Sequence, residues 1–99
     1  MRVLLNDGMD EEGVRLFEDA GIETDKHKRD PKSLVAQVGE FDALVVRSAT
    51  AVAREVIESG VKGKLKVIGR AGVGTDNIDV KSATENGVIV KSAPFGNTN

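Results

Sequence analysis

A cluster of glycines beside an arginine is the part of this sequence best suited to chemistry. Gly69, Arg70, Gly72 and Gly74 stand close together, directly after the apolar run at residues 65–68. Glycines let the backbone turn sharply and present its N–H groups to a ligand, and the neighbouring guanidinium adds a positive charge. Such a turn suits the carboxylate or phosphate of a small anionic ligand. The alternative interpretation is a tight connection between a strand and a helix.

The pair Gly72 and Gly74 also begins like a dinucleotide-binding fingerprint. Asn77, however, stands where the third glycine of that fingerprint would fall. An isolated pair of glycines around one residue is weak evidence for binding cofactor phosphates. The sequence pattern therefore favours an anion-contacting loop without identifying a nucleotide.

Arg47 and Ser48 form a second candidate site, directly after the apolar run Ala43–Val46. Thr50 is a plausible cap for the helix that follows. A guanidinium, a hydroxyl and a helix N-terminus together make a favourable phosphate site. The alternative is that Arg47 pairs with a nearby carboxylate and Ser48 caps a turn. Taken together with Arg70 and the glycine turn, the set favours anion binding.

No catalytic set and no metal site is predicted. The sequence has no cysteine, which excludes thiolate catalysis, and its single histidine, His27, lies in a charged run that predicts a solvated position. Paired acids such as Glu11 and Glu12, or Asp76 and Asp79, fall at expected helix starts, where capping and the helix dipole explain them. The chemistry indicated by the residues is therefore binding.

The composition predicts one soluble globular domain. The 99 residues are 39% apolar and 30% charged, with a formal net charge of −2. An acidic balance argues against a general nucleic-acid or membrane-surface role. No apolar run approaches the roughly 20 residues of a membrane span. Residues 1–5 are too short for a secretory signal, so we expect a cytoplasmic protein.

Apolar runs and helical patterns alternate along the chain. We expect strands at residues 2–6, 22–26, 43–46, 65–68 and 88–90. We expect four helices: the first capped by Asp10 and ended by Gly21, the second from Asp30 to Gly39, the third from Thr50 to Gly60, and the fourth at Val80–Glu85. The inward positions of the first three helices are predicted from helical spacing to be Gly13, Leu16, Phe17 and Ala20; Leu34, Val35 and Val38; and Val52, Ala53, Val56 and Ile57.

This alternation predicts an α/β fold with a parallel five-stranded sheet of flavodoxin-like order 2-1-3-4-5. The first helix should cover one face and the other three the opposite face. A helix after the fifth strand, on the face of the first helix, is missing from the pattern, so we expect an incompletely covered apolar face. Ligands of such sheets bind beyond the carboxyl ends of the strands. Asn6 and Asp7 should flank that crevice on one side, with Arg47 and Ser48 on the other.

A phospho-accepting receiver domain is a rival interpretation from a different functional class. Asp7 and Lys91 match loosely the acidic residue after the first strand and the lysine after the fifth. A receiver also needs an aspartate after the third strand, where this sequence has Arg47. An arginine would bind phosphate but could not accept it covalently, so the receiver interpretation fails.

The chain resembles the NAD-dependent D-2-hydroxyacid dehydrogenases, and among them the D-3-phosphoglycerate dehydrogenases. The resemblance covers essentially all 99 residues and is most specific in Val46-Arg47-Ser48-Ala49-Thr50, in residues 65–79 and in residues 93–98. Ser92 and Thr75 depart from the commonest family residues without placing the family in doubt. The resemblance implies that residues 1–99 are the N-terminal segment of a flavodoxin-like substrate-binding domain that is closed by a helix from the far C-terminal part of the chain.

The resemblance also implies specific roles. Arg47 and Ser48 would hold the substrate phosphate with Arg70 nearby, the amides of Ala71, Gly72, Val73 and Gly74 would meet the substrate carboxylate, and Val73 would approach NAD. The ligand would be a small phosphorylated hydroxy acid, and the complete enzyme a homo-oligomer. In the family the Rossmann cofactor domain and the catalytic residues follow, beyond a hinge near Asn97, so we expect these 99 residues alone to be inactive.

The complete enzyme would oxidise 3-phosphoglycerate to 3-phosphohydroxypyruvate and so open serine synthesis. Two alternatives stay open. One is the same segment of a glyoxylate or hydroxypyruvate reductase, whose substrate has no phosphate. The other is a flavodoxin-like regulatory domain that only binds a ligand.

Overall fold

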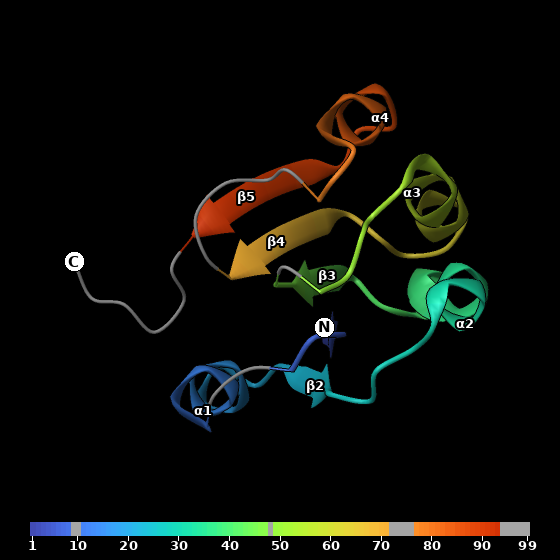
Figure 1. Ribbon diagram of the computed structural model, residues 1–99. Helices are drawn as coiled ribbons and strands as arrows, with labels where there is room; N and C mark the ends of the chain where they lie inside the picture. The colour runs from blue at the N-terminus through green and yellow to red at the C-terminus, as the bar shows by residue number, and fades with distance from the viewer. Residues whose placement is uncertain (9–10, 48, 72–76, 94–99) are drawn as a thin grey trace.

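A five-stranded parallel sheet forms the centre of the computed structural model, which describes residues 1–8, 11–47, 49–71 and 77–93. The strand order is β2-β1-β3-β4-β5, as predicted (Figure 1). The strands are β1 (Arg2–Leu5), β2 (Glu23–Asp25), β3 (Ala43–Val46), β4 (Val67–Ala71) and β5 (Ile89–Ala93). The change of direction in this order lies between β1 and β3, which is the switch point where doubly wound sheets bind ligands.

The helices lie on both faces of the sheet. They are α1 (Glu11–Asp19), α2 (Pro31–Gln37), which continues into the short 3-10 helix η1 (Val38–Glu40), α3 (Arg54–Lys62) and α4 (Val80–Glu85). Figure 1 shows α1 alone on one face and α2, α3 and α4 together on the other, as the sequence predicts.

The core has two layers because β1 and β3 are buried on both faces. Alternate residues of each strand belong to different apolar clusters: Leu4 and Leu44 to one, Val3 and Val45 to the other. The larger cluster joins the sheet to α2, α3 and α4, and the smaller one joins it to α1. Burial on both faces explains why these strands read as continuous apolar runs.

The α1 helix buries a different stripe from the one predicted. Gly13 and Val14 are buried and Phe17 is partly buried, whereas Leu16 is 61% exposed and Ala20 is also exposed. The predicted stripe shares Gly13 and Phe17 with the observed one. The helix is turned so that Val14 rather than Leu16 meets β1 and β3.

The face of the sheet that carries α1 is incompletely covered, as expected. Among the described residues no helix lies over β5 on this face (Figure 1), and Ile89 of β5 is 54% exposed. Val67 of β4 is only partly buried against the smaller cluster.

The predicted boundaries of three elements were wrong in the second half of the chain, among them the fifth strand, which spans Ile89–Ala93 rather than residues 88–90. The fourth strand spans Val67–Ala71 rather than residues 65–68, because pairing with β3 and β5 carries it through Gly69 and Arg70. The third helix begins at Arg54 rather than next to Thr50, because Val52 ahead of it forms an isolated bridge with Ile78, and the helix continues past Gly60 to Lys62.

Gly60 and Gly63 lie where neighbouring atoms leave no room for a side chain, and Gly60 does not end α3 as predicted, because the helix continues to Lys62. A Cβ at Gly63 would lie 2.2 Å from the carbonyl oxygen of Gly39, and a Cβ at Gly60 would lie 2.4 Å from Cδ2 of Leu65. The amide of Lys64 donates to the same Gly39 oxygen at 2.8 Å. The end of α3 is thereby packed directly on η1.

Candidate functional site

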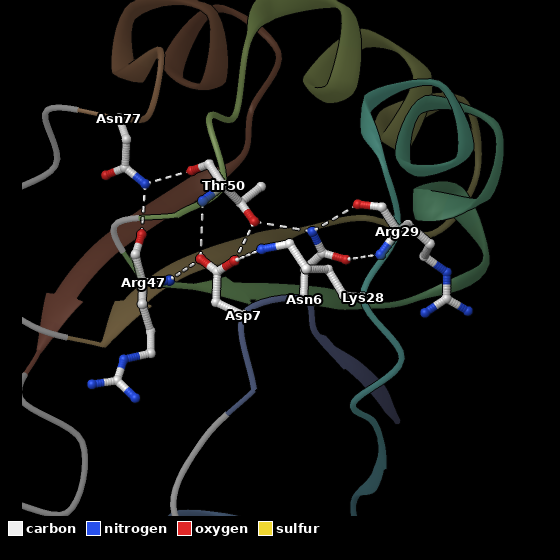
Figure 2. Close-up of polar contacts among 7 residues, drawn as sticks. All are labelled: Asn6, Asp7, Lys28, Arg29, Arg47, Thr50 and Asn77. Carbon is white, nitrogen blue, oxygen red and sulfur yellow. Dashed lines mark hydrogen bonds and ion pairs between the residues drawn. The ribbon is translucent and has the colours of Figure 1, made fainter.

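The two arginines of the predicted site lie at the same edge of the sheet. Arg47 follows the last residue of β3, and Arg70 of β4 is the register partner of Val46. Both therefore stand at the carboxyl ends of the strands, where the sequence placed them. Arg47 is exposed and Arg70 is partly buried. In Figure 2 the guanidinium of Arg47 points away from Asp7 and Asn77, the two side chains that bind its main chain.

The remaining predicted ligand residues are only partly covered by the structure. Ala71 closes β4 and pairs in register with Ala93. Ser48, Gly72, Val73 and Gly74 lie outside the described residues. Their roles toward substrate, and that of Val73 toward NAD, stay predictions, as do the binding roles of Arg47 and Arg70.

Asp7 is the centre of a buried polar network just behind Arg47 (Figure 2). Its side chain is 3% exposed. It accepts hydrogen bonds from the main-chain amides of Arg47, at 2.7 Å, and Thr50, at 3.1 Å, and from the Thr50 hydroxyl. Lys28 adds an ion pair, with Nζ 3.0 Å from Oδ1. The Asp7 carboxylate thus connects the loop after β3 with the loop after β2.

These contacts keep Asp7 ionised. Burial, the largest single influence, opposes the charged form, but the hydrogen bonds from Thr50 and the Arg47 amide and the bond and charge of Lys28 together outweigh it. The pKa of Asp7 therefore lies below its usual value. A carboxylate held in this way contributes to the loop structure at neutral pH.

The predicted capping role of Thr50 was wrong, because its polar atoms are already engaged elsewhere. Its hydroxyl and amide both donate to Asp7. The N-cap of α3 is Ala53, which makes no side-chain capping bond. The helix N-terminus is thus separated by several residues from Arg47, and the amides of Arg47 and Thr50 are not available to a phosphate.

Asn77 holds the same loop from the other side. Its Nδ2 donates to the carbonyl oxygens of Arg47, at 2.7 Å, and Thr50, at 2.6 Å. Its Oδ1 is buried and has no hydrogen-bond partner among the described residues. Asn77 therefore connects the chain just ahead of α4 to the loop that carries Arg47.

Asn6 extends the network toward α2. It is 1% exposed, and its Nδ2 donates to the Thr50 hydroxyl at 3.0 Å. Its Oδ1 accepts from the amide of Arg29 at 2.8 Å. The guanidinium of Arg29 is itself bound by Asp25 and Gln37, so this arginine has a structural role.

A groove of about 810 Å³ opens beside this network, between the starts of α2 and α3. Its lining is largely apolar and includes Leu34, Val35 and Val56. Arg47 and Arg70 are not part of the lining. The groove is therefore distinct from the predicted anion site at the strand ends.

Two further properties concern the described ranges only. No group of three or more histidine or acidic side chains there is arranged to hold a metal ion. No helix in those ranges has the length and apolar character needed to cross a membrane.

Sequence reasoning identified the edge of the sheet but missed what organises it. Asn6 and Asp7 were placed beside the crevice without a role, and Asn77 was noted only as a missing glycine. The sequence offered one indication: Asn6 directly follows an apolar run predicted to be a buried strand, and a buried amide side chain requires hydrogen-bond partners. Those partners come from distant parts of the chain.

Comparison with known proteins agrees with this architecture. The sequence model for the D-isomer specific 2-hydroxyacid dehydrogenase, catalytic domain, matches residues 3–99. The chain is 47% identical over 97 residues to D-3-phosphoglycerate dehydrogenase 2, chloroplastic, of Arabidopsis thaliana, covering 98% of this chain and 15% of that protein. It is 45% identical over 94 residues to D-3-phosphoglycerate dehydrogenase of Methanocaldococcus jannaschii, covering 95% of this chain and 18% of that protein.

A solved structure gives the same result at the level of the fold. The NAD⁺-bound 3-phosphoglycerate dehydrogenase of Entamoeba histolytica superimposes with a TM-score of 0.76 and 26% identity, covering 93% of this chain and 32% of that one. The chain thus spans less than a third of each of these relatives. It belongs to the D-isomer specific 2-hydroxyacid dehydrogenase family.

Proposed function

We propose that this chain is the substrate-binding part of a phosphoglycerate dehydrogenase, an oxidoreductase that converts 3-phosphoglycerate to 3-phosphohydroxypyruvate with NAD. This reaction would supply the first intermediate of serine synthesis. The proposal is supported by the names of the relatives above and by the position of Arg47. We further propose that the complete enzyme is cytoplasmic and homo-oligomeric.

The observation that carries the proposal is an exposed arginine on a fixed main chain at the carboxyl edge of the sheet. The Arg47 amide and carbonyl are held by Asp7 and Asn77, while its guanidinium points away from both (Figure 2). A guanidinium can bind a phosphate through two parallel hydrogen bonds, and it stays charged at every physiological pH. Arg70, at the next strand end, adds a second positive charge to the same edge.

The chain's own task in this proposal is to hold and orient the substrate. Arg47 and Ser48 bind the phosphate, and the main-chain amides from Ala71 to Gly74 bind the carboxylate, so the hydroxyl-bearing carbon between them is placed in a fixed position. NAD, when bound, accepts the hydride from that carbon. Since the Asp7 carboxylate at this edge is already bound by the loop amides, the Thr50 hydroxyl and Lys28, we propose that the chain alone does not turn over substrate.

A binding titration tests the proposal. The ¹⁵N-labelled chain is titrated with 3-phosphoglycerate and, separately, with glycerate, which lacks the phosphate, and amide chemical shifts are followed. We expect tighter binding of 3-phosphoglycerate, and a loss of about tenfold or more in affinity for Arg47→Ala, equal to about 1.4 kcal/mol. Arg15→Ala, which removes an exposed arginine from α1, is the matched control and should bind normally.

Three outcomes would count against the proposal. Absence of shifts at millimolar 3-phosphoglycerate, or equal affinity of wild type and Arg47→Ala, removes the phosphate role. Equal affinity for glycerate and 3-phosphoglycerate favours the glyoxylate or hydroxypyruvate reductase instead. NADH formation by the purified chain, measured by absorbance, overturns the proposed inactivity.

A further inference from the structure

We infer that Asp7 and Asn77 are positioning residues: they fix the main chain of Arg47 and so determine where its guanidinium stands at the edge of the sheet. The inference rests on the proposed function in one respect, namely that Arg47 binds the phosphate. The inference adds two residues that do not contact the substrate themselves but determine how tightly the chain binds it.

Asp7 fixes the N–H side of the loop. Its carboxylate accepts from the amides of Arg47 and Thr50, and both bonds lie at a site where the Asp7 side chain is 3% exposed. Asp7 itself stands two residues after the end of β1. The loop after β3 is therefore anchored to a neighbouring strand rather than only to its own.

Asn77 fixes the carbonyl side of the same loop. Its single amide nitrogen donates to the carbonyl oxygens of Arg47 and Thr50, the same two residues whose amides Asp7 binds. Arg47 is thus held at both of its main-chain polar groups, by side chains that precede and follow it by 40 and 30 positions. Because the main chain is fixed on both sides, the guanidinium can change its position only by rotation about the bonds of the Arg47 side chain.

A carboxylate close to an anion site would ordinarily repel the ligand, and here that repulsion is reduced. Asp7 receives hydrogen bonds from three donors of the loop and an ion pair from Lys28, whose ammonium offsets its charge. The Arg47 guanidinium points away from Asp7 and is not neutralised by it (Figure 2). The negative charge is therefore used to organise the loop, while the positive charge stays available to the ligand.

A purely structural role for Asp7 would also explain the buried bonds, so the test must separate the two. A structural role predicts a loss of stability without a specific dependence on Arg47. A positioning role predicts that substituting Asp7 weakens phosphate binding only while the Arg47 side chain is present. A double-mutant cycle measures this dependence directly.

The experiment uses the whole 99-residue chain and 3-phosphoglycerate as the probe, with affinity read from amide shifts and folding from the dispersion of the spectrum. Asp7→Asn keeps the size of the side chain but removes its charge and one acceptor. We expect it to weaken binding about tenfold, as expected for the loss of a charge-assisted bond. In an Arg47→Ala background the same substitution should change the affinity less than twofold.

The matched control is Asp42→Asn. Asp42 also accepts a main-chain hydrogen bond, from the amide of Arg2 at 2.8 Å, but at the opposite end of the sheet. It should leave the affinity unchanged. Asn77→Ser provides the second variant if Asp7→Asn does not fold, and it should give the same loss and the same dependence on Arg47.

The outcomes distinguish this inference from the proposed function. If the wild-type chain does not bind 3-phosphoglycerate, the proposed function fails and the role in binding fails with it. If the wild type binds and Asp7→Asn and Asn77→Ser bind equally well, only the inference fails. It also fails if their effects persist in full when Arg47 is alanine, because the two residues then act independently of its side chain.

Discussion

Thr50→Val provides a direct measure of what the Asp7 network contributes to folding. Thr50 is 7% exposed, and valine has nearly the same shape, so the substitution removes a hydroxyl without opening a cavity. The hydroxyl donates to the Asp7 carboxylate and accepts from Asn6 Nδ2 at 3.0 Å. Both bonds are lost, whereas the bond from the Thr50 amide to Asp7 can be kept.

The size of the effect follows from the two groups left behind. A hydrogen bond to a charged group contributes about 1.5–3 kcal/mol, and a buried polar group left without its partner costs about 1–3 kcal/mol. Asp7 keeps its two amide donors and Lys28, and Asn6 Nδ2 keeps only a long bond of 3.4 Å to the carbonyl of Arg29. We therefore expect a loss of about 3 kcal/mol, a large part of the roughly 5–15 kcal/mol typical of whole domains.

Urea unfolding followed by circular dichroism tests this value, with the m-value checked for constancy between variants. Thr84→Val is the matched control: Thr84 is exposed in α4, and the change should stay within about 0.5 kcal/mol. If Thr50→Val lowers the free energy of unfolding by less than about 1 kcal/mol, the hydroxyl does not couple Asp7 to Asn6 as the structure indicates.

Two further predictions concern packing and pH. Gly63→Ala should destabilise the chain by more than about 3 kcal/mol or prevent folding, because its Cβ would lie 2.2 Å from the Gly39 carbonyl oxygen. Gly8→Ala is the control: its Cβ would have open space, so it should cost only about 1–2 kcal/mol for its φ of 73°. Equal losses for both variants in thermal melting would contradict the close contact at Gly63. The pKa of Asp7 is lowered in the folded state from 3.8, since its hydrogen bonds and Lys28 outweigh burial. Its contribution to the free energy of unfolding is therefore complete above about pH 4 and is lost as the pH falls through the folded pKa. The stability difference between wild type and Asp7→Asn, measured by urea unfolding, should shrink below about pH 4, and a difference that is constant down to about pH 2.5 would contradict the assignment.

The fold could be predicted because its signals are local. Continuous apolar runs indicate strands buried on both faces, as β1 and β3 are, and Asp30 before Pro31 marks the start of α2, where Asp30 does accept from the Ser33 amide at 2.8 Å. Gly21, with a φ of 79°, ends α1 as expected. Right-handed crossovers then restrict the order of the strands. The boundaries of β4 and α3 were wrong because they depend on tertiary pairing.

The sequence predicted that Arg47 and Arg70 lie at the carboxyl edge of the sheet, but it did not predict the polar network beside Arg47. Arg47 and Arg70 were placed correctly because the carboxyl ends of parallel strands meet at one edge. The network behind Arg47 has no local signature: Asp7 and Thr50 are 43 positions apart, and Asn77 and Arg47 are 30 apart. Sequence spacing gives no reason to pair them until the strand order is known.

The incorrect assignment of Thr50 shows how a tertiary contact overrides a local preference. A hydroxyl that caps a helix gains about 1 kcal/mol, and α3 forgoes this gain, since Ala53 makes no capping bond. In exchange Thr50 makes a charge-assisted bond to Asp7 and accepts a second from Asn6, and together these exceed the value of the cap. Because Asp7 also binds the amide of Arg47, the contact that displaces the cap is the one that fixes the loop carrying the proposed phosphate ligand. The departure from the local preference for a helix cap therefore lies in the loop to which we assign the proposed phosphate binding.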